Sequence, residues 1–237
     1  MRIFGNYLEA SKEIERDLWE LGAIATTKSF QDEQGEFETR ELIGYQFSVP
    51  TAGSILTLPD FFGEPRQDFL DYVHLETGDR WYGRGNPGNS WKVRRKVWEK
   101  YLHNDRFAYA YGERAWDPTN QFGHCKQTLQ SDPNSRQAIV QIYDKHKDWT
   151  NTGGRARIPC SLTYQFLSRS SDSGPTVHCI YTMRSCDFYK HFVYDMVIAG
   201  KLTGMMASEL GWYKGNLIVQ IGSLHAFRTD LDKRKIF

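Results

Sequence analysis

The sequence predicts an α+β protein in which a mixed β-sheet packs against helices. Over much of residues 155–185 apolar residues alternate with polar ones, as in half-buried strands. Residues 6–22 and 192–211 instead carry apolar residues at helical spacing. Helices and strands follow one another irregularly, which favours the α+β class over a regular α/β repeat. The 237 residues show no linker, so we expect a single domain over residues 1–237.

Helical spacing is the main signal in the first part of the chain. Apolar residues near one face and a closing Gly22 predict a helix within residues 6–22. A Gly-containing turn and then a strand are predicted over residues 31–49, and repeated Pro and Gly make residues 50–65 a loop. Two further predicted helices span residues 65–76 and 90–105.

The connection between these two helices, residues 77–89, is rich in Gly and basic residues and contains the run GRGNPG. A phosphate-binding loop is one interpretation of this run. It lacks the Lys-Ser/Thr ending, and no predicted strand precedes it. We therefore favour an ordinary connection.

Strands dominate the second part of the chain. The predicted strands follow turn signals or alternate in polarity, and they span residues 135–144, 157–169, 176–185 and 216–227. A hairpin-like turn over residues 170–174 joins the middle two. The helix within residues 192–211 ends at Gly211, and a short charged tail follows the last strand.

Composition excludes several classes of partner. Lys plus Arg is 30 and Asp plus Glu is 29, a balance that argues against direct nucleic-acid binding but allows a local phosphate pocket. The N-terminus is charged and no apolar run approaches a membrane span, so we expect a cytoplasmic protein without membrane contact. The four cysteines form no CxxC pair and have no zinc-spaced His, so we expect reduced thiols and no metal.

Cys160 is the candidate nucleophile. It follows Pro159 in the run RIPCSLTYQF, with Arg155 and Arg157 just before it. A thiol reacts as the thiolate, and nearby positive charge favours that form. The alternative is that Cys160 is a small buried apolar residue of a strand.

Several runs, in one order, resemble motifs of the thymidylate synthase superfamily. PNSRQAIV is similar to its arginine-bearing strand, RIPCSLTYQF to its nucleophile strand, MRSCD to its phosphate and cofactor turn, and GSLHAF to the strand with a sugar-facing histidine. Within the superfamily the closest resemblance is to bacteriophage deoxycytidylate (dCMP) hydroxymethylases. The resemblance implies a homodimer formed through a sheet face, 5,10-methylenetetrahydrofolate as cofactor and a pyrimidine monophosphate as substrate.

The same resemblance implies roles for individual residues. Arg184 and Ser185 would bind the phosphate, together with an Arg136 that reaches from the partner subunit. Asp187 would contact the folate ring, and His225 would order the sugar. Taken alone, Arg136 is better interpreted as a surface charge and His225 as a satisfied core histidine.

Two further residues complete the implied catalytic set. Tyr111, in YGERAW, matches a tyrosine near the nucleophile. The acid that organises water should fall in residues 65–76, where Asp71 is the best match and Asp68 the fallback.

Residue 195 distinguishes the branches of the superfamily. Uracil-specific members have Asn there, whose amide both donates and accepts and so matches O4 and N3–H of uracil. Asp195 instead can accept from N4 of cytosine and, when protonated, donate to its N3. The alternative is that Asp195 caps the helix that begins near it.

The expected reaction begins with addition of Cys160 to C6 of the base, which makes C5 a carbon nucleophile. After one-carbon transfer, water would give 5-hydroxymethyl-dCMP, whereas hydride would give the methylated base. A methylase or hydroxymethylase acting on dCMP or CMP, and a non-catalytic nucleotide-binding homologue, stay open. The context that the resemblance implies is modified-base synthesis, as in a phage.

The chain departs from the family pattern at the phosphate and sugar sites. Gln137 replaces the second arginine of the usual Ser-Arg-Arg, and Arg40 is displaced from the position of the N-terminal phosphate-binding cation. Phe227 stands where relatives have a tyrosine that binds the sugar. Recognition of phosphate and sugar is therefore expected to differ from that of the family.

Overall fold

The computed structural model describes residues 1–30, 33–148, 158–171 and 174–234. These residues form a sheet in the order β1-β3-β7-β6-β5-β4, with β2 paired to β3. The strands are β1 (Arg2–Ile3), β2 (Ala23–Phe30), β3 (Glu33–Pro50), β4 (Ile139–Gln141), β5 (Ser161–Ser171), β6 (Gly174–Asp187) and β7 (Tyr213–Phe227). The β1–β3 and β6–β7 pairs are parallel and the others antiparallel, so the sheet is mixed.

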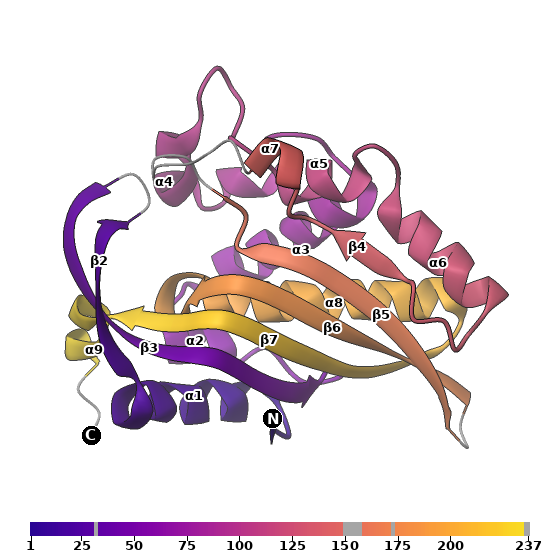
Figure 1. Cartoon of the computed structure of the whole chain (residues 1–237), viewed down its shortest axis with the longest axis horizontal. Helices are drawn as coiled ribbons and strands as arrows, with labels where there is room; N and C mark the ends of the chain where they lie inside the picture. Colours follow the sequence, from indigo (N-terminus) through magenta and orange to yellow (C-terminus); the bar gives the residue numbers. More distant parts are fainter. Residues whose placement is uncertain (31–32, 149–157, 172–173, 235–237) are drawn as a thin grey trace.

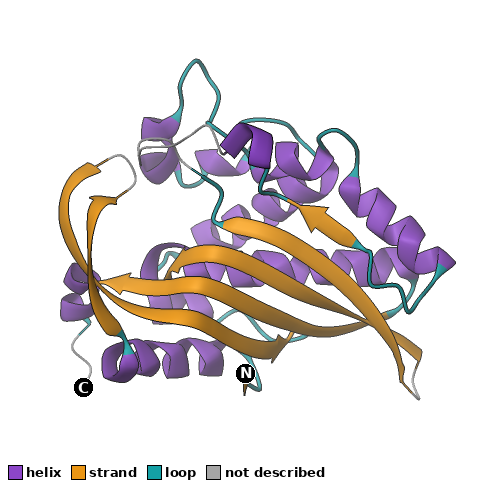
Figure 2. Cartoon of the chain, in the orientation of Figure 1, coloured by secondary structure: helices purple, strands orange, loops and turns teal. Residues whose placement is uncertain are grey.

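The helices gather against this sheet, which confirms the predicted fold class. They are α1 (Tyr7–Leu21), α2 (Leu58–Phe62), α3 (Arg66–Tyr82), α4 (Arg95–Trp98), α5 (Tyr111–Trp116), α6 (Gln121–Ser131), α7 (Lys145–Asp148), α8 (Val193–Leu210) and α9 (Arg228–Lys233). Short turns η1 (Ser90–Lys92), η2 (Glu99–Tyr101) and η3 (Phe188–Phe192) complete the structure. In Figures 1 and 2, α3 and α8 lie behind the strands, and the other face of the sheet is turned toward the viewer.

Helix α8 is the central helix of the core. It contacts β6 and β7 on one side and α3 on the other, and most of its residues are buried. The alternation in β6 shows why the sheet packs against this helix: Cys179 and Tyr181 are buried against the helices, whereas Ile180 and Thr182, which alternate with them, are partly exposed. The period of two predicted for this strand is therefore confirmed.

Two predicted helices differ from the observed ones. The helix predicted at residues 65–76 continues to Tyr82 and ends at Gly83, which has a positive φ of 61°. Residues 90–105 form the short turns η1, α4 and η2 rather than one helix. Here Trp91 and Trp98 both pack edge-on against Phe107, so contacts across the fold override the local helical spacing.

Several elements were not predicted. β2 is half polar and shows no clear alternation, so its pairing with β3 is a tertiary effect. α6 begins where the Asn120 side chain accepts a hydrogen bond from the amide of Gly123, a capping signal that the sequence does carry. α2 and α9 are single turns in the predicted loop and charged tail. The tip of the predicted turn, residues 172–173, lies outside the described residues.

The described residues contain neither a candidate membrane span nor a candidate metal cluster. They contain no helix with the length and apolar character needed to cross a bilayer. They also bring together no group of three His, Cys, Asp or Glu side chains that could hold a metal ion.

Candidate active site

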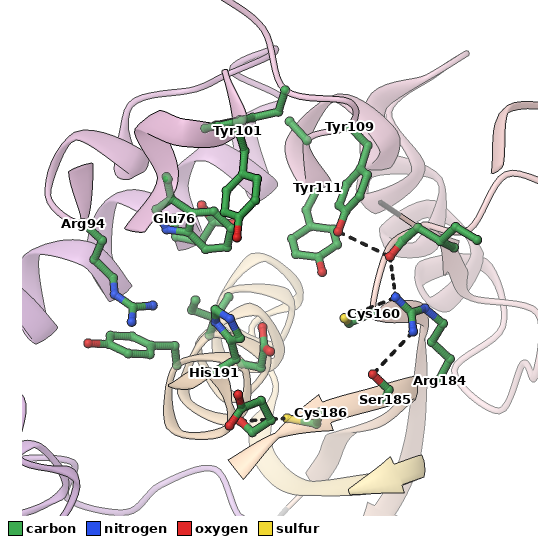
Figure 3. Close-up of a pocket in the computed structure, with 18 of the residues that line it drawn as sticks. Glu76, Arg94, Tyr101, Tyr109, Tyr111, Cys160, Arg184, Ser185, Cys186 and His191 are labelled. Carbon is green, nitrogen blue, oxygen red and sulfur yellow. Dashed lines mark hydrogen bonds between the residues drawn. The ribbon is translucent and has the colours of Figure 1, made fainter. Parts of the chain in front are cut away.

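A cavity of about 720 Å³ opens where β6, β7 and the first residue before β5 meet α3, α5 and α8. It brings together the predicted site residues Tyr111, Cys160, Arg184, Ser185, Asp187, Asp195 and His225. Figure 3 shows Cys160 and Arg184 on one side of the cavity and Glu76 and Arg94 on the other. Residues far apart in the sequence thus form one site.

Arg184 hydrogen-bonds to the backbone of the segment that carries Cys160. Its guanidinium donates to the carbonyl oxygens of Pro159 (Nε, 3.0 Å) and Ile158 (Nη2, 2.7 Å). The same Nη2 lies 3.7 Å from Sγ of Cys160, which is half-buried at the cavity wall. A positive charge beside the sulfur favours the thiolate, the reactive form. Arg155 and Arg157 lie outside the described residues.

Hydroxyl and imidazole groups extend this side of the cavity. Ser185 Oγ accepts a hydrogen bond from Nη1 of Arg184 (3.4 Å). Ser223 donates to a carboxylate oxygen of Glu41, and its Oγ lies 3.4 Å from Nδ1 of His225. Burial lowers the pKa of His225, so its ring is neutral at pH 7. A neutral ring in this position can donate to or accept from a sugar hydroxyl.

Asp195 lies in the first turn of α8, 8% exposed at the cavity wall. Its side chain caps no helix: the N-cap residue of α8 is Phe192, which makes no side-chain capping bond. Asp187 makes the cap instead, since its Oδ1 accepts from the amides of Tyr189 (3.1 Å) and Lys190 (3.2 Å). The capping alternative for Asp195 is therefore wrong.

Arg80 lies between the carboxyl groups of Glu76 and Asp195 in the wall of the cavity. Its Nε donates to Oε1 of Glu76 (2.8 Å), and its Nη2 lies 3.6 Å from Oδ1 of Asp195. Its Nη1 donates to the hydroxyl of Tyr164 (2.6 Å), and the guanidinium stacks 4.2 Å from the ring centroid of Tyr111. Sequence analysis missed Arg80 and Glu76, because a Glu and an Arg four residues apart on a helix indicate a solvent-exposed pair.

The acid predicted within residues 65–76 needs a correction. Asp71 is exposed, bonded to Nε2 of Gln67 (2.8 Å), and does not line the cavity; neither does its fallback Asp68. Glu76 does line it, and Ser90 Oγ donates to its Oε2 (2.5 Å). Five residues along a helix turn a side chain by about 140°, so the two acids face different sides of α3.

Aromatic side chains form the far end of the cavity, namely Trp91, Trp98, Tyr101, Phe107 and His191. The rings of Trp98 and His191 lie 5.6 Å apart, and Arg94 stacks 4.1 Å from the ring centroid of Tyr194. Flat rings of this kind, of which all but the buried Tyr101 are partly exposed, suit a planar heterocycle.

Asp187 supports the fit of a folate ring at this end. Its Oδ2 is buried and has no hydrogen-bond partner among the described residues. Burial raises the pKa of Asp187 to about 7. An acceptor left unsatisfied in a cavity matches a ligand that brings N–H donors, as a pterin does.

We predict that Asp187→Asn changes stability in a pH-dependent way. Because the folded-state pKa is raised, the wild type loses stability as pH rises from about 4 to 7. The variant lacks this loss, so its free energy of unfolding relative to wild type should rise by about 2–4 kcal/mol between pH 4.5 and 8. Urea unfolding of both proteins at the two pH values measures it, and a difference independent of pH would contradict the prediction.

Arg136 lies apart from the cavity of its own chain. Its side chain is exposed just before β4, and its carbonyl accepts from Nε2 of Gln165 (2.8 Å). The expected role at a partner's phosphate stays a prediction.

The fold is that of a thymidylate synthase. It matches the thermostable thymidylate synthase A of Bacillus subtilis with a TM-score of 0.73 at 18% identity, covering 96% of this chain and 82% of that one. The sequence profile described as thymidylate synthase matches residues 80–236. The chain therefore belongs to the thymidylate synthase family.

Two curated relatives show how distant the similarity is. A thymidylate synthase of Sphingopyxis alaskensis is 31% identical over 108 residues, 46% of this chain and 32% of the relative. One of Corynebacterium aurimucosum is 26% identical over 176 residues, 69% of this chain and 62% of the relative. The chain thus spans less than two thirds of the length of these relatives. Members of the family are one-carbon transferases that use 5,10-methylenetetrahydrofolate as cofactor.

Proposed function

We propose that this chain is a single catalytic domain over residues 1–237 that transfers a hydroxymethyl group to C5 of dCMP. The observation that carries the proposal is that Cys160 and Asp195 line one cavity. A nucleophilic sulfur and a base-reading carboxyl in the same cavity are what the reaction on cytosine needs. The resemblance to bacteriophage dCMP hydroxymethylases points in the same direction.

Cys160 starts the reaction as a thiolate beside Arg184. Its sulfur forms a bond to C6 of cytosine, and the electron pair of the C5–C6 double bond moves so that C5 becomes nucleophilic. Bound 5,10-methylenetetrahydrofolate supplies the one-carbon unit that C5 takes up. C5 then loses its proton, water adds to the new carbon, and the sulfur leaves C6. The net change consumes one water and releases tetrahydrofolate and 5-hydroxymethyl-dCMP.

Asp195 selects the base. Its carboxyl accepts from the N4 amino group of cytosine, and a single proton shared with N3 completes a second hydrogen bond. Uracil offers a carbonyl where cytosine has the amino group, so it lacks the donor that Asp195 needs. This is the basis for preferring cytosine over the uracil of thymidylate synthases.

The other residues of the cavity position the two ligands. Arg184 and Ser185 bind the phosphate, and His225 orders the sugar. Asp187 takes the N–H donors of the folate ring with its unpartnered Oδ2. Tyr111 lines the wall near Cys160, where burial raises the pKa of its hydroxyl and keeps it protonated. Glu76, in place of Asp71, organises the water that adds to the new carbon.

A homodimer is part of the proposal. The face of the sheet away from α8 carries partly exposed Leu167, Ile180 and Ile218, and Ile180 pairs with Ile218 across β6 and β7. A broad sheet face of this kind can pair with its copy by two-fold symmetry. Arg136 then reaches the phosphate of the partner's site.

The test is the product formed. The protein is incubated with 5,10-methylenetetrahydrofolate and dCMP, dUMP or CMP, and nucleotides are analysed by mass spectrometry. We expect dCMP to gain a hydroxymethyl group. Gain of a methyl group would instead assign a methylase, turnover of CMP a ribonucleotide enzyme, and no product with any nucleotide would leave a non-catalytic binding protein.

A further inference from the structure

Arg80 is a buried cation whose partners are groups of the site itself. The residue is 2% exposed, so its guanidinium has given up nearly all of its hydration. Glu76 and Asp195 supply opposite charges, and Tyr164 supplies a hydroxyl acceptor. A desolvated charge is tolerated only with such partners, so Arg80 and the two acids form one electrostatic unit.

Several charged and titratable groups surround the carboxyl of Asp195. Those that face it come from four sides: Tyr72, Glu76 and Arg80 on α3, Arg94 before α4, Tyr111 on α5, and Tyr164, Tyr181 and Cys186 on β5 and β6. Burial raises the pKa of Asp195 to about 6, and the positive charge of Arg80 is the largest opposing influence. Arg80 therefore does most to keep this carboxyl ionised at neutral pH.

The charge on Asp195 matters differently for the two bases. Cytosine can carry a proton at N3, so an ionised carboxylate binds N3–H and N4–H together in a charge-assisted pair. Uracil already has a proton at N3 but presents the O4 acceptor beside it, so the carboxyl must itself be protonated to make both bonds. An ionised Asp195 thus favours cytosine, and a neutral one accepts either base.

We infer that Arg80 is a specificity-determining positioning residue, which keeps Asp195 negatively charged through the contact of Nη2 with Oδ1 and so excludes uracil from a site that takes cytosine. The same guanidinium holds Glu76 through Nε, at the side of the cavity opposite Cys160. The inference rests on the proposed role of Asp195 in reading the base. It adds that base selection depends on a residue that does not touch the base.

The test compares Arg80→Met with wild type in two measurements. In the first, the γ-carboxyl of Asp195 is titrated by ¹³C NMR in the protein without ligands, with Asp195→Asn to assign the signal. Loss of the guanidinium should raise the pKa of Asp195 by at least about one unit. Arg94→Met, which removes a more weakly acting arginine of the same cavity, should raise it less.

The second measurement is kcat/KM for dCMP and dUMP between pH 5.5 and 8.5. Arg80→Met should lower the preference for dCMP at least about tenfold at pH 7. Turnover of dUMP by the variant should fall as pH rises through the new pKa of Asp195. In an Asp195→Asn background, Arg80→Met should not change the preference, because residue 195 then has no charge to control.

The outcomes separate the two proposals. If wild type forms no product, the proposed function is wrong, and the titration alone decides on Arg80. An Asp195 pKa that is the same in Arg80→Met and wild type, or an unchanged preference in a wild type that uses dCMP, overturns the inference. Arg80→Gln, which keeps hydrogen-bond donors and removes the charge, replaces Arg80→Met if circular dichroism shows that the latter does not fold.

Discussion

Cys160→Ser should lose at least about 10⁴-fold in kcat for the modification of dCMP. The sulfur makes the bond to C6 that turns C5 into a nucleophile, so later steps cannot begin without it. A serine hydroxyl beside Arg184 does not ionise at neutral pH, whereas a thiol does in part. Product formation is followed by mass spectrometry after long incubation, because small residual rates decide the magnitude.

A covalent readout tests the same step independently of turnover. With 5-fluoro-dCMP and the folate, fluorine at C5 cannot leave as a proton does, so the adduct on the sulfur accumulates. Intact-protein mass spectrometry should detect it in wild type and not in Cys160→Ser. Cys125→Ser is the matched control, since Cys125 is buried on α6 away from the cavity. Comparable turnover by Cys160→Ser and wild type would rule out the nucleophile.

The sequence was informative where a functional residue stands in a short contiguous run. Cys160 in RIPCSLTYQF lies just before β5, and Arg184 in MRSCD lies on β6, the partner strand of β5, so the motifs predicted residues that are also close in space. The fold class followed from periodicity. β6 is a long strand in which buried and partly exposed residues mostly alternate, and α8 is a long helix with most of its residues buried. These features depend on local pattern.

The missed residues depend on packing between distant segments. Glu76 and Arg80 have the spacing of a surface pair, but contacts with Asp195 on α8 and Tyr164 on β5 bury Arg80 and leave Glu76 only partly exposed. Asp71 was the opposite error, an acid in the expected segment that faces solvent. The sequence of a helix shows which residues share a face. Which of these faces lines the cavity is set by the elements that pack against the helix.

The two aspartates at the start of α8 show a similar limit. Asp187 comes just before η3 and Asp195 lies in the first turn of α8, and capping was the alternative interpretation of the second. The cap is at Asp187 because η3 inserts an extra turn before α8. This turn leaves Asp195 inside the helix with its carboxyl directed to Arg80 rather than to backbone amides.

Asp195→Asn should reverse the choice of base. We expect kcat/KM for dCMP to fall about 10²- to 10³-fold and that for dUMP to rise above it. An amide accepts from N3–H and donates to O4 of uracil, but it cannot transfer a proton to N3 of cytosine, so the charge-assisted pair with cytosine is lost. The measurement is kcat/KM for both nucleotides with 5,10-methylenetetrahydrofolate at pH 7.

The matched control is Asp71→Asn, the same substitution on the exposed side of α3. It should leave both kcat/KM values unchanged, because Asp71 does not line the cavity. If Asp195→Asn keeps the wild-type preference for dCMP while Cys160→Ser is inactive, the nucleophile is correct and another group must read the base.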